Sequence, residues 1–173
     1  KNLLLQKKLN MKILGIGNAI VDVICKVDDN FIKQNNLTKS TMKLFFDENE
    51  FKNLLKNLKI EKTVSGGSVA NSIVGISQLG NKAGFIGKIS DDIFGSKYEE
   101  GLKKENVEYF YSKKKEKLPT GTCLILVTPD SERTMCTYLG TAGKINESDV
   151  NANAVKNSEI ILLEGYLWDE GEP

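Results

Sequence analysis

Short apolar runs alternate with amphipathic segments along most of this chain, and this alternation constrains the fold more than any other feature. Residues 12–17 (KILGIG), 82–89 (KAGFIGKI) and 159–167 (EIILLEGYL) are apolar enough to form buried strands. Between them, residues 47–58 and 91–106 space their apolar side chains as helices do. Strands that alternate with helices predict an α/β fold built on parallel βαβ units.

Two strand-like segments do not fit that alternation. Residues 40–46 (STMKLFF) and a hairpin around the turn at 129–132 (PDSE) carry many polar side chains. Such strands are better placed in a small exposed sheet than in a central layer covered by helices. We therefore expect a second, smaller sheet that lies over the main layer like a lid.

The composition argues against several classes of protein. The chain of 173 residues carries 24 Lys and Arg against 23 Asp and Glu, so no bulk positive charge favours nucleic acid. No apolar run approaches the roughly 18 residues of a membrane span. Histidine is absent, which rules out Ser-His-Asp catalysis and His-based zinc sites. Three cysteines without CxxC spacing or a secretory signal indicate free thiols and a cytoplasmic protein.

The stretch SGGSVANS (65–72) sets a turn with few side chains directly before a helix. Gly66 and Gly67 leave backbone N–H groups uncovered, and the helix that follows adds unpaired N–H groups and a positive dipole end. Ser68 is expected to cap this helix, with Asn71 one turn further on. Because no Lys or Arg lies in the turn, such a surface suits a polyol better than a triphosphate. A plain capped connection between strand and helix explains the same residues equally well.

Asp22 interrupts an otherwise apolar alternating strand, AIVDVICKV (19–27). An ionised carboxylate at such a position must be paired, exposed at an edge of the sheet, or bound to a ligand. A carboxylate can accept hydrogen bonds from two neighbouring hydroxyl groups, which is one way to bind a sugar. A solvent-facing residue on an exposed strand is the alternative interpretation.

Two partial motifs do not indicate nucleotide-binding sites. Residues 15–20 (GIGNAI) carry the first two glycines of a dinucleotide fingerprint, but Ile20 replaces the third and no helix follows. Residues 84–89 (GFIGKI) end like a phosphate-binding loop. However, Lys82 stands in place of the first glycine, and Ile89 replaces the Ser or Thr that would bind Mg²⁺.

Several motifs together resemble the ribokinase-like PfkB family of carbohydrate kinases, and within it the adenosine-kinase-like sugar and nucleoside kinases. The resemblance spans essentially all of 11–173, and the stretch from Gly66 to Gly95 fits the family's N-terminal signature. The motifs are GNAIVD (17–22), SGGSVANS (65–72), GFIGKISDDIFG (84–95), TGTCLILVTPDSERTM (120–135) and ILLEGYLWD (161–169).

The resemblance implies a ribokinase-like αβα sandwich with a small β-sheet lid. It also implies transfer of the γ-phosphoryl group of ATP, with Mg²⁺, to a hydroxymethyl group of a sugar or nucleoside. Family lids can pair between subunits, so a homodimer formed through the lid is a further expectation, whereas nucleic acid and membrane partners are not expected. The lid strands implied by the resemblance are 19–27, 40–46, 107–112 and 122–138.

The family's binding residues carry over to specific positions of this chain. The resemblance implies that Asp22 holds the sugar hydroxyls, that Glu164 contacts a sugar and that Tyr166 forms an aromatic wall beside a nucleoside. Arg133 matches a lid arginine that can approach the phosphates. The full set of implied substrate-binding residues is Asn18, Asp22, Met42, Leu44, Gly66, Gly67, Ser68, Asn71, Glu164 and Tyr166.

The chain also departs from the family pattern. The GAGD-like turn, which supplies the catalytic Asp and an anion hole in the family, is absent, and so is the N-x-x-E motif of the Mg²⁺ region. We therefore expect residues 11–173 to be the substrate-binding N-terminal part of such a kinase, truncated at the C-terminal half and inactive alone. Residues 1–10 (KNLLLQKKLN) are expected to be a non-native leader. A catalytically silent sugar- or nucleoside-binding homologue is the alternative.

Overall fold

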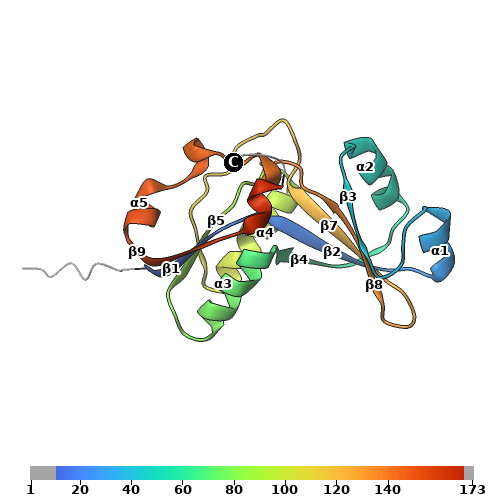
Figure 1. The fold of residues 1–173 in the computed structure, drawn as a ribbon, viewed down its shortest axis with the longest axis horizontal. Helices are drawn as coiled ribbons and strands as arrows, with labels where there is room; N and C mark the ends of the chain where they lie inside the picture. Colours follow the sequence, from blue (N-terminus) through green and yellow to red (C-terminus); the bar gives the residue numbers. More distant parts are fainter. Residues whose placement is uncertain (1–10, 170–173) are drawn as a thin grey trace, which may run out of the picture.

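The structure is a computed structural model that describes residues 11–169 and contains two β-sheets (Figure 1). A parallel sheet of four strands has the order β6-β5-β1-β9, and a mixed sheet of five strands has the order β3-β8-β7-β2-β4. The four-stranded sheet consists of β1 (Met11–Ile16), β5 (Ala83–Ile86), β6 (Glu108–Tyr109) and β9 (Ser158–Leu163). The five-stranded sheet consists of β2 (Ile20–Lys26), β3 (Met42–Phe45), β4 (Ile60–Gly66), β7 (Gly121–Val127) and β8 (Arg133–Tyr138).

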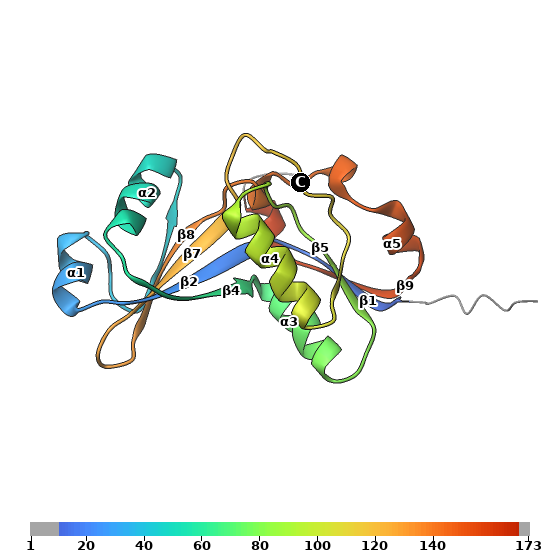
Figure 2. The same ribbon diagram turned by 180° about the vertical axis from the view of Figure 1, so that it is seen from behind.

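Helices lie on both faces of the four-stranded sheet, as the alternation in the sequence predicts. On one face Gly15 of β1 lies against Ile73 of α3 (Ser68–Gln78). On the other, Leu14 shares a hydrophobic cluster with Ala154 of α5 (Ala152–Lys156). Figure 2 shows α4 (Ile93–Lys104) beside α3, and α1 (Asp29–Gln34) with α2 (Glu48–Lys56) at the far end of the five-stranded sheet. Three 3₁₀-helices complete the description: η1 (Ala142–Lys144), η2 (Glu147–Asp149) and η3 (Gly165–Trp168).

The predicted helix at 47–58 is confirmed as α2, with slightly shorter bounds. It begins after Asp47, whose side chain accepts hydrogen bonds from two backbone N–H groups of the first turn. Its apolar stripe buries Phe51 and Leu54. The ring of Phe51 stacks on that of Tyr138 from β8, with centroids 5.6 Å apart, so the helix covers the outer face of the five-stranded sheet.

The start of α3 differs from its prediction in one respect. Ser68 does not cap the helix: the cap is Gly67, whose φ of 104° lies in the left-handed region that favours glycine. Ser68 is the first helical residue, and its hydroxyl donates to Glu164 instead. Ser68, the expected cap, therefore joins the start of α3 to Glu164, which is distant in sequence.

One strand was assigned to the wrong sheet and another was missed. Residues 107–112 were expected in the lid, but β6 pairs with β5 in the four-stranded sheet, because Tyr109 packs among the buried aromatic rings of Phe85 and Tyr98. Conversely, residues 60–66 form β4, an edge strand of the five-stranded sheet that sequence reasoning missed. Most of its side chains are exposed, so it lacks the buried alternation that marks a strand.

The chain passes between the two sheets through segments that touch backbone to backbone. A Cβ atom on Gly67 would lie 2.4 Å from the backbone oxygen of Asn18, and one on Gly121 would lie 2.7 Å from that of Leu139 and 3.0 Å from that of Ala19. Such distances are too short for any side chain, so glycine is required at both positions. The turn after β1, the start of α3 and the start of β7 are therefore held in one compact junction.

The outer strand β9 keeps apolar side chains in solvent on both of its faces. Ile160 pairs with Ile13 and Leu163 with Ile16, so these two residues of β9 point to opposite sides. Ile160 is 52% exposed and Leu163 is 53% exposed. No described strand pairs with the outer edge of β9. The strand itself is confirmed, but its expected burial is wrong, because parallel sheets bury both faces only when further layers cover them.

We expect the 173-residue chain, expressed alone, to bind the dye 1-anilinonaphthalene-8-sulfonate and to self-associate at micromolar concentration. The double variant Ile160→Thr/Leu163→Thr should reduce dye fluorescence and light scattering, because it removes apolar surface from both faces of β9. The matched control is Leu79→Thr, which alters a leucine that is 81% exposed elsewhere on the surface. Equal effects of the control and the double variant would contradict the role given to β9.

Candidate functional site

A cavity of about 370 Å³ lies between the five-stranded sheet, the first turn of α3 and the residues that follow β9. One face of β2, β3, β7 and β8 forms its wall, and β1 and β9 end beside it. Its lining residues are Asn18, Ile20, Asp22, Met42, Leu44, Gly67, Ser68, Asn71, Cys123, Met135, Thr137, Leu139, Glu164, Tyr166 and Asp169.

Asp22 brings a half-buried carboxylate to this cavity from the middle of β2. Burial raises its pKa from 3.8 to about 6, and no described residue donates a hydrogen bond that would lower it. Gly66 of β4 leaves room for the carboxylate, because a Cβ atom there would lie 2.3 Å from Oδ2 of Asp22. The oxygens of Asp22 are therefore available to hydrogen-bond donors on a ligand.

Asn18 lies in the turn after β1 and is 3% exposed. Its Oδ1 atom is the one buried side-chain nitrogen or oxygen within residues 11–169 that has no hydrogen-bond partner. An unsatisfied buried acceptor costs about 1–3 kcal/mol. Since Asn18 lines the cavity, a ligand that donates a hydrogen bond to Oδ1 would remove that cost.

Glu164 follows β9 and is 5% exposed. Its Oε2 accepts a hydrogen bond from the backbone N–H of Asn18 at 2.9 Å, and its Oε1 accepts one from the hydroxyl of Ser68 at 3.1 Å. Burial raises the pKa of this carboxyl, while these donors and the backbone N–H of Val69 oppose the rise. Glu164 thus joins the end of β9 to the turn after β1 and to the first turn of α3.

The first turn of α3 contributes neutral polar groups to the cavity. Gly67 bears no side chain, the Ser68 hydroxyl is engaged with Glu164, and the exposed amide of Asn71 lines the space. No Lys or Arg occurs among the lining residues that the structure describes. Hydroxyl groups therefore suit this part of the cavity better than anions do.

The wall formed by the five-stranded sheet is mainly apolar. Strand pairing sets Cys123, Thr137 and Leu44 in one row across β7, β8 and β3. Burial raises the pKa of the Cys123 thiol to about 11, so it remains uncharged at neutral pH. Beside this row, Met42 is 56% exposed and Met135 is 39% exposed. An uncovered apolar surface therefore borders the polar groups of the cavity.

Residues 12–172 match the model of the pfkB family of carbohydrate kinases, which is nearly the whole chain. The chain belongs to this family. The expected resemblance to PfkB kinases is confirmed by that match and by the relatives and solved structures described next.

Two curated relatives of this pfkB-family chain are sugar kinases. The 5-dehydro-2-deoxygluconokinase of Mesomycoplasma hyopneumoniae strain 232 is 29% identical over 122 residues, which make up 69% of this chain and 36% of the relative. The fructokinase of Escherichia coli is 41% identical over 68 residues, 39% of this chain and 22% of the relative. The matched segments cover 36% of the first relative and 22% of the second, so the chain spans only part of their length.

Solved structures of similar proteins share the fold. The adenosine kinase of Sinorhizobium meliloti superposes with a TM-score of 0.84 at 34% identity, covering 94% of this chain and 50% of that protein. The probable sugar kinase of Rhizobium etli CFN 42 gives a TM-score of 0.83 at 34% identity, covering 94% and 49%. The predicted ribokinase-like fold is confirmed. Because these two proteins are named for different substrates, the fold alone does not separate nucleosides from sugars.

The pfkB-family chain brings most of the predicted substrate-binding residues to one cavity, although their role in binding stays a prediction. Gly66 does not line the cavity but lies behind Asp22. Arg133, a possible phosphate contact by the family resemblance, lies exposed at the start of β8 opposite Val127 and does not line this cavity, so its approach to a phosphate stays a prediction. The predicted residues that do line the cavity are Asn18, Asp22, Met42, Leu44, Gly67, Ser68, Asn71, Glu164 and Tyr166.

Sequence reasoning missed part of the lining. Ile20 lies two residues from the predicted Asp22 on β2, and Met135 and Thr137 lie two residues apart on β8. The alternation of side chains along a strand could therefore have identified these positions. Asp169, at the rim, follows no such pattern. The missed residues are Ile20, Cys123, Met135, Thr137, Leu139 and Asp169.

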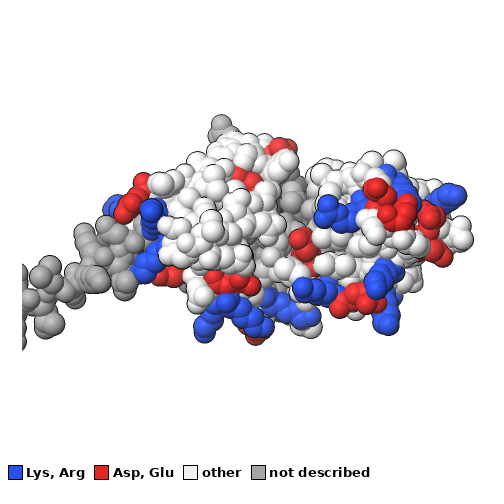
Figure 3. Space-filling view, turned by 90° about the horizontal axis from the view of Figure 1, so that it is seen from below, with Lys and Arg blue, Asp and Glu red and all other residues white. Residues whose placement is uncertain are grey.

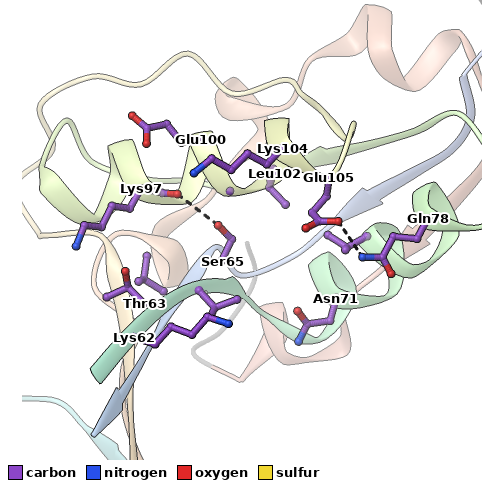
Figure 4. A pocket seen from close by; sticks show the side chains of 14 residues that line it. Lys62, Thr63, Ser65, Asn71, Gln78, Lys97, Glu100, Leu102, Lys104 and Glu105 are labelled. Carbon is purple, nitrogen blue, oxygen red and sulfur yellow. Dashed lines mark hydrogen bonds between the residues drawn. The ribbon is translucent and has the colours of Figure 1, made fainter. Parts of the chain in front are cut away.

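A larger groove of about 620 Å³ lies outside this cavity, between α3, α4 and β4. Figure 4 shows Lys62, Lys97 and Lys104 around it, and all three side chains are exposed. Asn71 is the one predicted site residue that also lines this groove. Exposed charged groups are well hydrated without a ligand, whereas the smaller cavity holds one buried and one half-buried acceptor that lack a donor. We therefore take the smaller cavity as the candidate site.

In Figure 3, basic and acidic side chains lie in neighbouring patches rather than in a basic stripe on the face shown. Within residues 11–169, no three or more His, Cys, Asp or Glu side chains form a group that could hold a metal ion. No helix in that range is long and apolar enough to cross a membrane.

Asp22→Asn should stabilise the ligand-free protein at pH 7.5 while weakening its ligand binding. The folded state raises the pKa of Asp22 from 3.8 to about 6, so the protonated form is favoured in the fold. Stability is therefore lost as the pH rises from about 4 through about 6, and the asparagine variant escapes this loss. We expect it to melt roughly 2–4 °C higher at pH 7.5, with no difference near pH 4, since the carboxylate is partly solvated.

Calorimetric melts of both proteins across this pH range, with and without adenosine or ribose, would check the two effects together. Any stabilisation that adenosine or ribose gives the wild type should be lost in Asp22→Asn, because an amide offers one acceptor oxygen in place of two. Asp47→Asn, an exposed helix cap outside the cavity, controls for loss of charge. A lower melting temperature for Asp22→Asn at pH 7.5, or unchanged ligand binding, would contradict this account.

Proposed function

We propose that this pfkB-family protein transfers the γ-phosphoryl group of ATP to a hydroxymethyl group of a nucleoside or sugar, and that the described residues hold the acceptor. The observation that carries the proposal is a pair of unsatisfied acceptors. The Asp22 carboxylate has no donor, the Oδ1 atom of buried Asn18 has none, and both line one cavity. A molecule with several hydroxyl groups supplies the donors that both atoms lack.

The chemistry of these residues is binding and orientation. The ionised carboxylate of Asp22 can accept from two neighbouring hydroxyls, and Asn18 can accept from a third, which fixes the face of the sugar ring. Phosphoryl transfer depends mainly on such positioning and on stabilisation of charge. Glu164 already accepts from two donors, so we do not assign it the role of catalytic base.

ATP and Mg²⁺ are implied by the family and are not assigned to residues of this chain. No group of carboxylates in the described part of the chain fits a metal ion. The chain spans about half the length of the solved structures that it matches. We propose that the base, the anion hole and the ATP-binding residues lie in sequence that corresponds to the other half of those proteins.

The apolar wall of the cavity favours a nucleoside over a free sugar as the molecule that receives the phosphoryl group. A monosaccharide carries hydroxyl groups around its whole ring, whereas the base of a nucleoside offers apolar faces. The row of Cys123, Thr137 and Leu44 and the exposed Met135 form an apolar wall beside the acceptors. Tyr166 also lines the cavity and is 61% exposed, so its ring is free to stack on a base.

The 173-residue chain alone should show no ATP turnover with adenosine, ribose or fructose, because it lacks the catalytic turn that the family uses. The protein produced from its complete gene should phosphorylate at least one of them in a coupled ATP-consumption assay, and Asp22→Ala should abolish that activity. Turnover by the 173-residue chain would contradict the first part. Ligand binding without turnover by the complete protein would instead support a catalytically silent homologue.

Met135→Lys should weaken adenosine binding about tenfold, or about 1.4 kcal/mol, and change ribose binding less than about twofold. The reason is that the charged side chain disrupts the apolar wall but not the acceptors. Titration calorimetry on the complete protein measures both affinities. Ile60→Lys is the control, because Ile60 is 44% exposed on the same sheet but does not line the cavity. Equal loss for adenosine and ribose would argue against a nucleoside.

A further inference from the structure

Tyr98 of α4 connects the two sheets through one fully buried side chain. Its ring packs against Phe85 of β5 and Tyr109 of β6, with ring centroids 6.2 Å and 6.0 Å away. Its hydroxyl donates a hydrogen bond of 3.2 Å to the backbone oxygen of Gly66 at the end of β4. Burial raises the pKa of this hydroxyl well above its ordinary value, so it stays protonated and able to donate. Tyr98 therefore contacts the four-stranded sheet through its ring and the five-stranded sheet through its hydroxyl.

A second hydrogen bond joins the same two segments in the opposite direction. The hydroxyl of Ser65, the residue before Gly66, donates to the backbone oxygen of Tyr98 at 2.9 Å. Figure 4 shows the Ser65 side chain pointing toward α4. A Cβ atom on Gly101, one turn further along the helix, would collide with this hydroxyl, so helix and strand are in close contact here. The end of β4 is therefore fixed to α4 by two reciprocal hydrogen bonds.

Gly66 lies directly behind the carboxyl group of Asp22. A Cβ atom on Gly66 would lie 2.6 Å from Cγ of Asp22 and 2.9 Å from its Oδ1. Strand pairing sets Gly66 opposite Ile20, two residues before Asp22, so the two positions share one face of the sheet. A displacement of Gly66 would therefore uncover the carboxylate or move it relative to the cavity that it lines.

We infer that Tyr98 is a positioning residue, which holds Gly66 through its hydroxyl and thereby fixes the Asp22 carboxylate at the cavity. Tyr98 is not among the residues that line the cavity, so its effect on a ligand there is indirect. The inference rests on the proposed function in so far as Asp22 binds a sugar or nucleoside. Its consequence is that α4, which contributes no lining residue, determines the position of the main acceptor of the site.

Tyr98→Phe tests this role because it keeps the packed ring and removes only the hydroxyl. Without that bond Gly66 is held less closely, and water gains access to Asp22. We expect the affinities for adenosine and for ribose to fall about fivefold each, the effect of about one hydrogen bond, because both ligands use the Asp22 carboxylate. Ser65→Ala removes the reciprocal bond and should lower both affinities as well. Titration calorimetry of the proteins made from the complete gene measures these changes.

Tyr111→Phe is the matched control. It removes the hydroxyl of another buried tyrosine, which donates to Glu116 at 2.9 Å and lies outside the cavity. It should change neither affinity by more than about twofold, since distant sites act independently. Equal losses from Tyr98→Phe and Tyr111→Phe would mean that Tyr98 contributes only to general stability, which overturns the inference. Unchanged affinities in Tyr98→Phe would overturn it as well.

A measurement without ligand keeps this inference separate from the proposed function. In a sample with ¹³C-labelled aspartate, the carboxyl signal of Asp22 is identified by its loss in Asp22→Asn. The pKa of this carboxyl should be about 6 in the wild type and closer to 3.8 in Tyr98→Phe, because more water reaches it. Tyr111→Phe should leave it unchanged. If the protein bound neither adenosine nor ribose, the proposed function would fail while this titration still decided the role of Tyr98. An unchanged pKa of Asp22 in Tyr98→Phe would overturn the inference.

Discussion

The hydrogen bonds to one buried carboxylate, that of Glu164, hold together the segments on which the candidate site depends. They link the end of β9 to the turn after β1 and to the first turn of α3. A buried charge is costly unless donors surround it, and the donors that converge here from residues 11–169 come from a turn and from a helix N-terminus. The requirement to satisfy this one charge therefore fixes three pieces of backbone relative to one another, and with them the floor of the cavity.

The position of the cavity follows from the topology of the two sheets. Parallel strands direct their carboxyl ends to the same edge of a sheet, so Asn18 after β1 and Glu164 after β9 meet there. The chain then enters the five-stranded sheet at Ile20, and Asp22 faces the same space two residues later. One short segment thus supplies acceptors from both sheets, and Gly66 of β4 makes room for the second of them.

Local patterns predicted most elements, and long-range contacts decided the rest. The spacing around Phe51 and the Gly66–Gly67 turn were sufficient to predict helices, because capping and amphipathicity act within a few residues. The strand at Tyr109 was assigned to the wrong sheet, because its place depends on rings distant in sequence. For Glu164 the family resemblance gave the position but not the partners: it lies 146 residues from Asn18, and no local pattern reports which donors a carboxylate will meet.

The two unsatisfied acceptors are best understood together. A carboxylate with a pKa raised to about 6 and a buried amide oxygen without a donor both reduce the stability of the empty protein. Either could be relieved within the fold by a nearby Lys or Arg, yet none lines the cavity among the described residues. Functional sites commonly depart in this way from what stability alone would favour. Since both groups accept and neither donates, the hydroxyl groups of the proposed substrate would supply the donors that the fold leaves out.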